Sequence, residues 1–414
     1  MLQALVLTMG CSEIQLSPHP GGSAAPGDTD IIEHIGNQMG IPSEGLLRGP
    51  AGELTTPPEP PNTPDGRALY AEGVIHDIHI ELGAEELASL RAEPRTPVRA
   101  WIEVGGEAFP NVELRLKGVS SYRNVDKKPS FKIDLHEWEL EQRVDGEKRL
   151  TLNNMIQDPT MLREHAYYWL ARELGVPAPR YAYARVRVND LDYGLYGLVE
   201  TMDEEIVEQL FDNDEDGNLY ESSGADFTYA RDWFDLEETA GIVATPDDIE
   251  ALVDAVEAAS DEEYWAMLQA NFDIDAVLSY WAVDIVAGND DGYVYNRHNY
   301  LAYYAPLAQR WSLLPWGTDR SFSRDVPPTG DDRTPLVGEL VIRCWDDAAC
   351  ADALTRRIVD VLAVWESTFP VEVTRAADQI EADCESDPRK EYDCDPDHLT
   401  DFIDERAAFV RARL

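Results

Sequence analysis

The sequence predicts an α+β protein with two lobes, the first built mainly of antiparallel strands and the second mostly helical. Segments with alternating apolar and polar residues crowd the region from about 67 to 200, which is typical of half-buried strands. From about 245 onward, apolar residues recur three and four positions apart, which is typical of helices. A chain of 414 residues also makes two lobes the natural expectation. We place the N-lobe at about 67–225 and the C-lobe at about 226–414.

The N-lobe is expected to begin near Ala68 and to contain a sheet and two helices. Its expected strands are "VIHDIHIEL", "VRAWIEVGG", "NVELRLKG", "SFKIDL", "YAYARVRVND" and "YGLYGLVET". A short helix is expected at "GAEELASLRAE". A longer helix is expected at "DPTMLREHAYYWLARELG", with Asp158 as its N-cap, Pro159 in its first turn and Gly175 at its end.

The C-lobe is expected to contain successive helices and one strand pair. The helices are "TPDDIEALVDAVEAA", "DEEYWAMLQANF" and "DIDAVLSYWAVDIVAG", and the strands are "NYLAYY" and "RWSLLPW". The tail from about 335 to 414 predicts further helices. Its four cysteines form two close pairs, Cys344 with Cys350 and Cys384 with Cys394. Two local disulfides in an oxidising compartment are favoured over a zinc site, whose usual cysteine spacings are shorter.

The N-terminus is expected to carry an export signal. The run "MLQALVLTMGCS" resembles the end of a bacterial lipoprotein signal, in which Cys11 becomes lipidated, although Thr8 stands where leucine is usual. The alternative is that residues 1–11 are not a signal. Residues 12–66 are rich in Pro, Gly, Ser and Thr, so we expect a disordered linker there. No other segment reaches the roughly 18 apolar residues of a membrane span.

The charge of the chain limits its partners. There are 80 acidic and 34 basic residues and a formal net charge of -46, which argues against nucleic acid or an anionic membrane as the main partner. Four of the six lysines nevertheless fall within "KGVSSYRNVDKKPSFK". These four are Lys117, Lys127, Lys128 and Lys132. A solvated basic hairpin is one interpretation, and a focused anion site is the one we favour.

The stretch "GNDDGYVYNRHNYLAYY" gathers short oxygen and nitrogen ligands between a helix and a strand. Asp291 and Asn296 are five residues apart, which matches the D-x-x-x-x-N spacing of a kinase catalytic loop. A hairpin then leads to Asp319 in "PWGTDRSF". This order of elements is that of a protein-kinase-like phosphotransferase, in which one Asp positions the attacking hydroxyl, an Asn and another Asp hold Mg²⁺ or Mn²⁺, and a lysine steadies the phosphates. The competing interpretation is that Asp and Asn here simply form a turn.

Several segments resemble the spore-coat protein H (CotH) kinase family, whose fold is an atypical protein-kinase-like one. The resemblance covers about 68–322. It rests on "LRLKGVSSYRNVDKKPSFKIDL", "DPTMLREHAYYWLARELGVPAPR", "YGLYGLVETMDEEIVEQLFDNDEDGNLYE", "NDDGYVYNRHNYLAYY" and "WSLLPWGTDRSF". The resemblance places the lysine segment on Lys128 and Lys132, the helix motif on Arg163 and Glu164, the catalytic aspartate on Asp291, and the Asn-Tyr strand entry on Asn299 and Tyr300.

The family's "PWD-x-D-x-x-F-G" segment falls on residues 315–323, and here the chain departs from the pattern. Gly317 replaces the first aspartate and Ser323 replaces the last glycine, whereas Asp319 is retained. The strand from Asn218 to Glu221 resembles the segment that links the two lobes, where an adenine would lie. The preceding "DNDEDG" begins like an EF-hand loop, but Ser223 stands where the bidentate glutamate belongs, so a plain acidic turn is favoured over a Ca²⁺ site.

These observations predict an extracytoplasmic kinase-like enzyme that moves the ATP γ-phosphoryl group to a Ser or Thr hydroxyl of a surface or secreted protein. The alternative is a non-catalytic binding or adhesion module, which Gly317 favours. The expected catalytic residues are Asp291, Lys128 and Lys132. The expected nucleotide-binding residues are Lys117, Lys128, Lys132, Glu164, Asn218 and Tyr220. The expected metal ligands are Asn296, Asn299 and Asp319.

Overall fold

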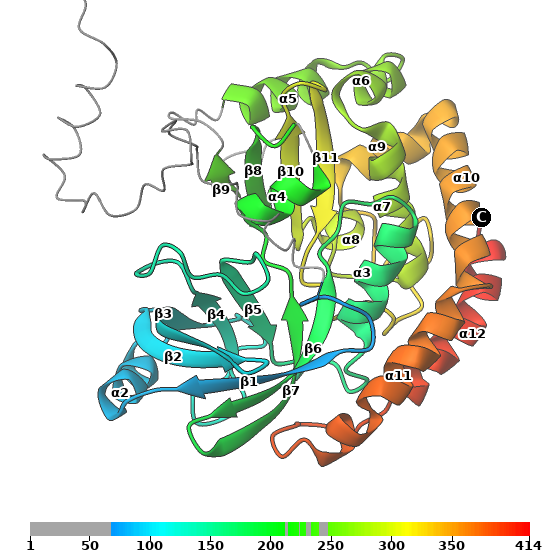
Figure 1. The fold of residues 1–414 in the computed structure, drawn as a ribbon. Helices are drawn as coiled ribbons and strands as arrows, with labels where there is room; N and C mark the ends of the chain where they lie inside the picture. The colour runs from blue at the N-terminus through cyan, green and yellow to red at the C-terminus, as the bar shows by residue number, and fades with distance from the viewer. Residues whose placement is uncertain (1–67, 212–213, 223, 229–232, 240–246) are drawn as a thin grey trace, which may run out of the picture. The chain divides into compact units, whose positions relative to one another are not determined.

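The computed structural model describes residues 68–211, 214–222, 224–228, 233–239 and 247–414 (Figure 1). The expected signal with Cys11 and the expected linker at 12–66 lie outside these residues. The described residues, from 68 to 414, form a single unit. Among the described residues, no helix is both long enough and apolar enough to cross a membrane.

The first half of this unit is a closed β-barrel. The strands follow one another around it in the order β1-β2-β3-β4-β5-β7-β6. Their bounds are β1 (Ile75–Glu81), β2 (Val98–Val104), β3 (Glu107–Lys117), β4 (Ser130–Asp134), β5 (Arg149–Asn153), β6 (Tyr181–Val188) and β7 (Leu191–Val199). Alternate residues of each strand fill the interior, as Leu114, Phe131 and Leu152 do, so their neighbours face outward.

The second half combines a small sheet with many helices. The sheet has the order β11-β10-β8-β9. Its strands are β8 (Asn218–Ser222), β9 (Phe234–Thr239), β10 (Tyr300–Ala305) and β11 (Arg310–Pro315). The described helices of the chain are α2 (Ala84–Ala92), α3 (Arg163–Glu173), α4 (Glu204–Leu210), α5 (Asp247–Ala258), α6 (Tyr264–Asn271), α7 (Ile274–Ala287), α8 (Tyr293–Asn296), α9 (Glu339–Asp346), α10 (Ala348–Trp365), α11 (Phe369–Ser386) and α12 (Asp397–Arg411).

The prediction of a two-lobed protein-kinase-like fold is wrong. The expected N-lobe sheet is a closed barrel, because β1 pairs in parallel with β6 from Ile75 opposite Tyr183 to Ile80 opposite Val188. The second half is not simply helical, because β8 and β9 join the expected β10–β11 pair to form a four-stranded sheet. Alternation along a sequence identifies strands, but it does not reveal which strands will pair.

Helix α3 packs against α7 and α11 and shares their core (Figure 1). It begins at Arg163, whereas the sequence predicts Asp158 as its N-cap. Asp158 instead accepts hydrogen bonds from the Thr160 hydroxyl at 2.7 Å and from the Arg163 N–H at 2.8 Å. The carboxylate therefore still satisfies one of the free N–H groups at the helix start. Gly175, with φ of 74°, follows the end of the helix as expected.

Both expected disulfides are confirmed. Cys344 is bonded to Cys350, and Cys384 is bonded to Cys394. The first joins α9 to α10, whereas the second joins the end of α11 to the loop before α12. The two bonds therefore constrain different parts of the helical half.

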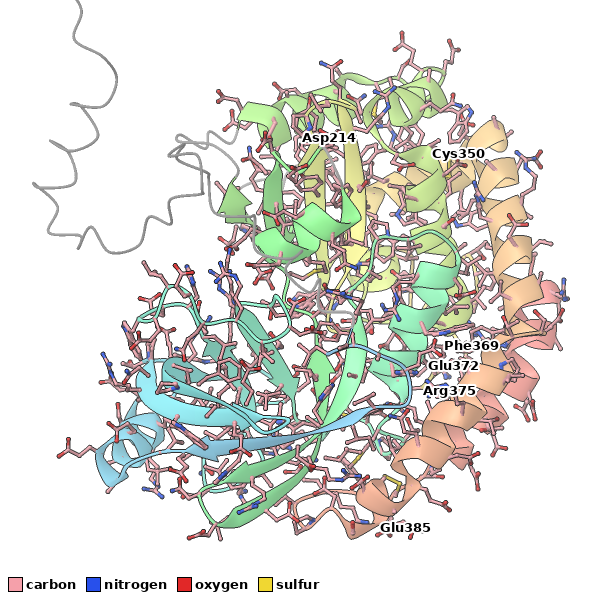
Figure 2. The ribbon with its side chains drawn as sticks, in the orientation of Figure 1. Asp214, Cys350, Phe369, Glu372, Arg375 and Glu385 are labelled. Atoms are coloured by element: carbon pink, nitrogen blue, oxygen red, sulfur yellow. A yellow bond between two sulfur atoms is a disulfide. The ribbon has the colours of Figure 1, made fainter. Side chains whose placement is uncertain are left out.

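The side chain of Glu372 links α11 to α3. Glu372 accepts hydrogen bonds from Arg375 and lies 2.7 Å from His165 on α3 (Figure 2). Burial alone would raise the pKa of Glu372, but the bonds from Arg375 and His165 outweigh it and lower the pKa to about 2. The carboxylate therefore stabilises the fold in its ionised form.

We expect the Glu372→Gln variant to unfold more easily than wild type at neutral pH. A pKa near 2, below the ordinary 4.5, implies a contribution on the order of 3 kcal/mol above pH 4.5, which fades as the pH falls toward 2. Urea unfolding of both proteins at pH 7 and at low pH measures the difference. A free-energy difference that stays the same at both pH values would contradict this assignment.

Candidate active site

A cleft of about 250 Å³ lies between the outer face of the barrel and the second sheet. The barrel supplies its cations, since the outward positions of β3, β4 and β5 fall in one row: Arg115 lies opposite Lys132, and Lys132 lies opposite Thr151. The second sheet and the β7–α4 connection supply apolar side chains. The residues that line the cleft are Arg95, Arg115, Lys117, Gly118, Lys132, Thr151, Thr201, Met202, Glu221, Leu301 and Trp316. The cleft is thus cationic on one side and apolar on the other.

Lys117 and Glu164 meet at one end of this cleft through a shared partner. The Lys117 Nζ donates to Asn153 Oδ1 at 2.8 Å and lies 5.1 Å from the centre of the Trp316 ring. The Asn153 Nδ2 donates to both carboxylate oxygens of Glu164, at 2.9 and 3.1 Å. Burial lowers the pKa of Lys117 to about 8, against the opposing effects of Glu164, Glu221 and Asp319. Lys117 is therefore the lysine that is linked, through Asn153, to Glu164 of the predicted helix motif.

Carboxylates gather beside this pair. Burial, together with the charges of Asp319 and Asp158, raises the pKa of Glu164 to about 7 against the opposing effects of Asn153 and Lys117. Burial likewise raises the pKa of Asp319 to about 6, with help from Asp158 and Asp291. Like charges held close together disfavour one another's ionised form. Burial is the larger cause for both groups, and the neighbouring carboxylates add to it.

Asp291 lies on the short segment after α7. Gly288 ends α7 in the left-handed region, with φ of 61°. The two carboxylate oxygens of Asp291 accept bonds from Asn296 Nδ2 at 2.6 Å and from Asn299 Nδ2 at 3.1 Å. The D-x-x-x-x-N spacing thus brings its two ends into contact. Asn299 itself has φ of 52°, a conformation that asparagine tolerates better than most residues.

The neighbouring Asp290 has a different role. Its buried carboxylate accepts bonds from Arg320 and from Arg324, the latter at 2.7 Å. Arg320 also lies 4.0 Å from Asp291. Asp290 therefore fixes the position of this segment against the one that carries Asp319.

Gly317 is held tightly against Asn299. It has φ of 53°, and a Cβ atom built on it would lie 3.2 Å from Asn299 Oδ1. The Trp316 N–H donates to the Asn299 carbonyl at 3.0 Å. An aspartate at 317 would therefore need Asn299 to shift.

The two lysines expected to be catalytic lie in different places. Lys132 lines the cleft. Lys128 is 2% exposed, and its Nζ lies 2.6 Å from Asp387 Oδ2, at the loop after α11. The structure therefore brings Lys117 and Lys132 to the cleft and directs the Lys128 ammonium group to Asp387 instead.

The structure also separates Asn218 and Tyr220 from the cleft. Both side chains bond Asp248 on α5, Asn218 at 2.8 Å and Tyr220 at 2.5 Å. Glu221, the next residue of β8, lines the cleft instead. Alternate residues of a strand face opposite sides, so a shift of one residue changes the face.

Sequence reasoning did not single out Arg95, Thr201, Met202 and Leu301, which line the cleft, or Asn153, which bridges Lys117 and Glu164. Asn153 could have been found, because it stands two residues from Thr151, which lines the cleft. The other residues carry no comparable local signal.

Two other acidic groups are weaker candidates for a metal. In "DNDEDG", Asp212 and Asn213 lie outside the described residues, and Asp214 accepts the N–H groups of Leu307 and Ala308 at 2.6 and 2.8 Å, which closes the β10–β11 turn (Figure 2). The carboxylates of Asp203, Glu204 and Glu205 lie within 4.8 Å of one another. Lys148 and Arg149 pair with them, which supplies the positive charge that a cation would otherwise bring.

The fold and the site together define an α+β protein in which a β-barrel and a second sheet enclose a cationic cleft beside a carboxylate cluster. The chain belongs to the CotH kinase protein family, whose model matches residues 114–410. The family resemblance predicted from the sequence is therefore confirmed.

Two curated proteins are similar to this chain. The inner spore coat protein H of Bacillus subtilis (strain 168) is 22% identical over 341 residues, which cover 77% of this chain and 91% of that protein. The invasin CotH2 of Rhizopus delemar is 24% identical over 241 residues, which cover 54% of this chain and 40% of the invasin. This chain thus matches less than half of the invasin's length.

Proposed function

We propose that the protein is a phosphotransferase that moves the γ-phosphoryl group of ATP to a serine or threonine hydroxyl of an extracytoplasmic protein. The observation that carries this proposal is the Lys117–Asn153–Glu164 chain at the cleft, together with Asp319, whose charge acts on Lys117 and Glu164, and Asp291, whose charge acts on Asp319. Phosphoryl transfer depends mainly on positioning and on stabilising charge, and this arrangement offers both.

The two sides of the cleft suit the two parts of a nucleotide. Lys117, Lys132 and Arg115 supply positive charge for the phosphates in a chain that is otherwise strongly acidic. Met202 and Leu301 supply an apolar surface for the base, with Thr201 as a polar neighbour. The base would therefore lie against the β7–α4 connection and β10.

The carboxylate cluster suits a divalent cation. Burial first, and neighbouring carboxylates second, raise the pKa values of Asp319 and Glu164, and a bound Mg²⁺ or Mn²⁺ would favour their ionised forms. Asp319 and the amide oxygens of Asn296 and Asn299 are oxygen ligands of the type that these ions prefer. When bound, the ion would neutralise phosphate charge and orient the triphosphate.

Asp291 is placed to hold the acceptor hydroxyl. Its carboxylate is fixed from two sides by Asn296 and Asn299, and it is only partly buried, so a substrate can approach it. It would accept the hydroxyl hydrogen while the oxygen attacks the γ-phosphorus, and the O–P bond to ADP breaks.

Metal binding is expected to strengthen as the pH rises. Protonated carboxyl groups do not bind cations, and Asp319 and Glu164 take up protons near pH 6 and 7. Calorimetric titration of the full chain with Mn²⁺ should give an affinity about 10-fold higher at pH 8 than at pH 5, with proton release on binding. The Asp319→Asn variant should lose most of this dependence. Equal wild-type affinities at the two pH values would count against the site.

The location and partner also remain proposals. The names of the two relatives refer to a spore coat and to an invasin, and we propose a surface or secreted location for this chain, with a lipid anchor at Cys11. The confirmed disulfides agree with an oxidising compartment. The net charge of -46 argues against nucleic acid as a partner.

Gly317 favours a second candidate, a binding module without phosphotransferase activity. It leaves the site without the carboxylate that the family pattern places there, and the close approach of Asn299 leaves little room for one. Incubation of the full chain with γ-labelled ATP, Mg²⁺ or Mn²⁺ and protein acceptors separates the two candidates. Transfer of label supports the enzyme, whereas metal-dependent binding of ATP without transfer supports the binding module.

A further inference from the structure

The loop between α11 and α12 is anchored to the barrel far from it in sequence. The disulfide between Cys384 and Cys394 closes this loop. Figure 1 shows the end of α11 beside β7, and Glu385 is labelled there in Figure 2. The anchor within the loop is Asp387, whose ion pair with Lys128 spans 259 residues of sequence.

Asp387 is held in a closely fitted position. Its side chain is fully buried, and in addition to Lys128 it accepts the Leu195 N–H at 2.9 Å and the Arg389 N–H at 2.8 Å. It lies directly against Gly194, where a Cβ atom would fall 2.2 Å from the carboxylate and where φ is +83°. Only glycine fits this combination of conformation and contact.

The same loop holds the β3–β4 connection at two further points. Arg389 donates to the Asp126 carbonyl at 3.0 Å, and its guanidinium lies 3.6 Å from the centre of the Tyr193 ring. Arg123 forms an ion pair of 2.5 Å with Glu391. The closed loop therefore contacts the lysine-rich segment at three places.

A short path leads from Lys128 to the cleft. The Lys128 carbonyl accepts the Asn154 Nδ2 at 2.8 Å, and the same amide group bonds the Ser121 carbonyl at 3.0 Å. The residue before Asn154 is Asn153, which bridges Lys117 and Glu164. A displacement of Lys128 would thus act on both ends of the β3–β4 connection and on β5.

We propose that Asp387, held by the disulfide-closed loop, is a positioning residue that sets the placement of Lys117, Asn153 and Glu164 in the cleft. Lys128 acts as the link and does not contact phosphate. A buried ion pair is weak evidence for added stability, but it specifies one arrangement, because a displaced partner leaves a buried charge unpaired. The expected effect on nucleotide binding rests on the proposed function. The expected effect on how well ordered β3, β4 and β5 are does not depend on it.

The test compares two disulfide variants of the full chain. Cys384→Ser with Cys394→Ser removes the bond that closes the loop, and Cys344→Ser with Cys350→Ser is the matched control that removes the other bond. Hydrogen exchange of the amides in 117–132 and 150–154 reports the order of the cleft strands. Binding of Mg²⁺–ATP reports their placement. We expect faster exchange in these segments and about 10-fold weaker ATP binding in the first variant alone.

A second comparison separates positioning from stability. Asp387→Asn leaves Lys128 unpaired, so both the melting temperature and the ATP affinity should fall. Adding Lys128→Met removes the unpaired charge and should restore most of the melting temperature, but it does not restore the link, so ATP affinity should stay low. Recovery of affinity together with melting temperature would overturn the proposal.

Unchanged hydrogen exchange in 117–132 and 150–154 after loss of the Cys384–Cys394 bond would also overturn the proposal that Asp387 positions these strands. An equal change in the matched control would do the same. If wild type binds no nucleotide, the proposed function fails, and the exchange measurements alone decide whether Asp387 positions these strands.

Discussion

Replacing Lys117 by methionine is expected to lower phosphoryl transfer by at least about 100-fold and ATP affinity by about 10-fold, because in the proposed function the lost ammonium group is the charged donor to the phosphates. Methionine keeps the apolar stem of the side chain but loses the ammonium group, and with it the bond to Asn153 and the cation–π contact with Trp316. Glu164 then loses the nearby positive charge that lowers its pKa, so its pKa should rise further above 7.

Lys127→Met is the matched control for this prediction. Lys127 belongs to the same basic segment, but its side chain is exposed and does not line the cleft. Transfer and binding should therefore remain within about 2-fold of wild type, as for most exposed substitutions. Equal losses in the two variants would indicate a general effect of charge, and no loss in Lys117→Met would remove this residue from the site.

Replacing Asp319 by asparagine is expected to lower transfer by about 1,000-fold or more while making the protein more stable. The loss follows from removing the proposed acidic metal ligand, which the amide would replace poorly. The stability gain follows from burial and from the repulsion of Asp158 and Asp291, which together raise the pKa of Asp319 to about 6. The variant should therefore melt at a higher temperature than wild type in the absence of metal.

Transfer assays and thermal unfolding of the same preparations measure the two effects of Asp319→Asn. Asp261→Asn serves as the control, because the Asp261 side chain is fully exposed. A variant that lost both activity and stability would show that Asp319 is mainly structural. Unchanged activity would show that the cluster does not serve catalysis.

The local elements of the fold could be predicted from the sequence, but their assembly could not. The run at Ile75–Glu81 alternates clearly enough to predict β1, yet its parallel partner β6 lies about one hundred residues away. No local pattern encodes that pairing, since closure depends on how the whole sheet coils. The expected two-lobed fold failed at this point.

The candidate site was predictable where its parts are close in sequence. Asp291, Asn296 and Asn299 lie on one short segment, and they do contact one another. Lys128 illustrates the opposite case, because its partner Asp387 is distant in sequence and nothing near Lys128 indicates burial. Tyr220 illustrates a third case, in which the strand was identified but the face that reaches the cleft was not.

The most direct test of the central claim is transfer of label from γ-labelled ATP by the full chain with Mg²⁺ or Mn²⁺, compared with its Asp291→Asn variant. We expect metal-dependent labelling of a protein acceptor on serine or threonine by wild type, a loss of about 100-fold or more in the variant, and ATP binding that the variant retains. Labelling that is equal in both proteins, or ATP binding without any transfer by wild type, would contradict the account.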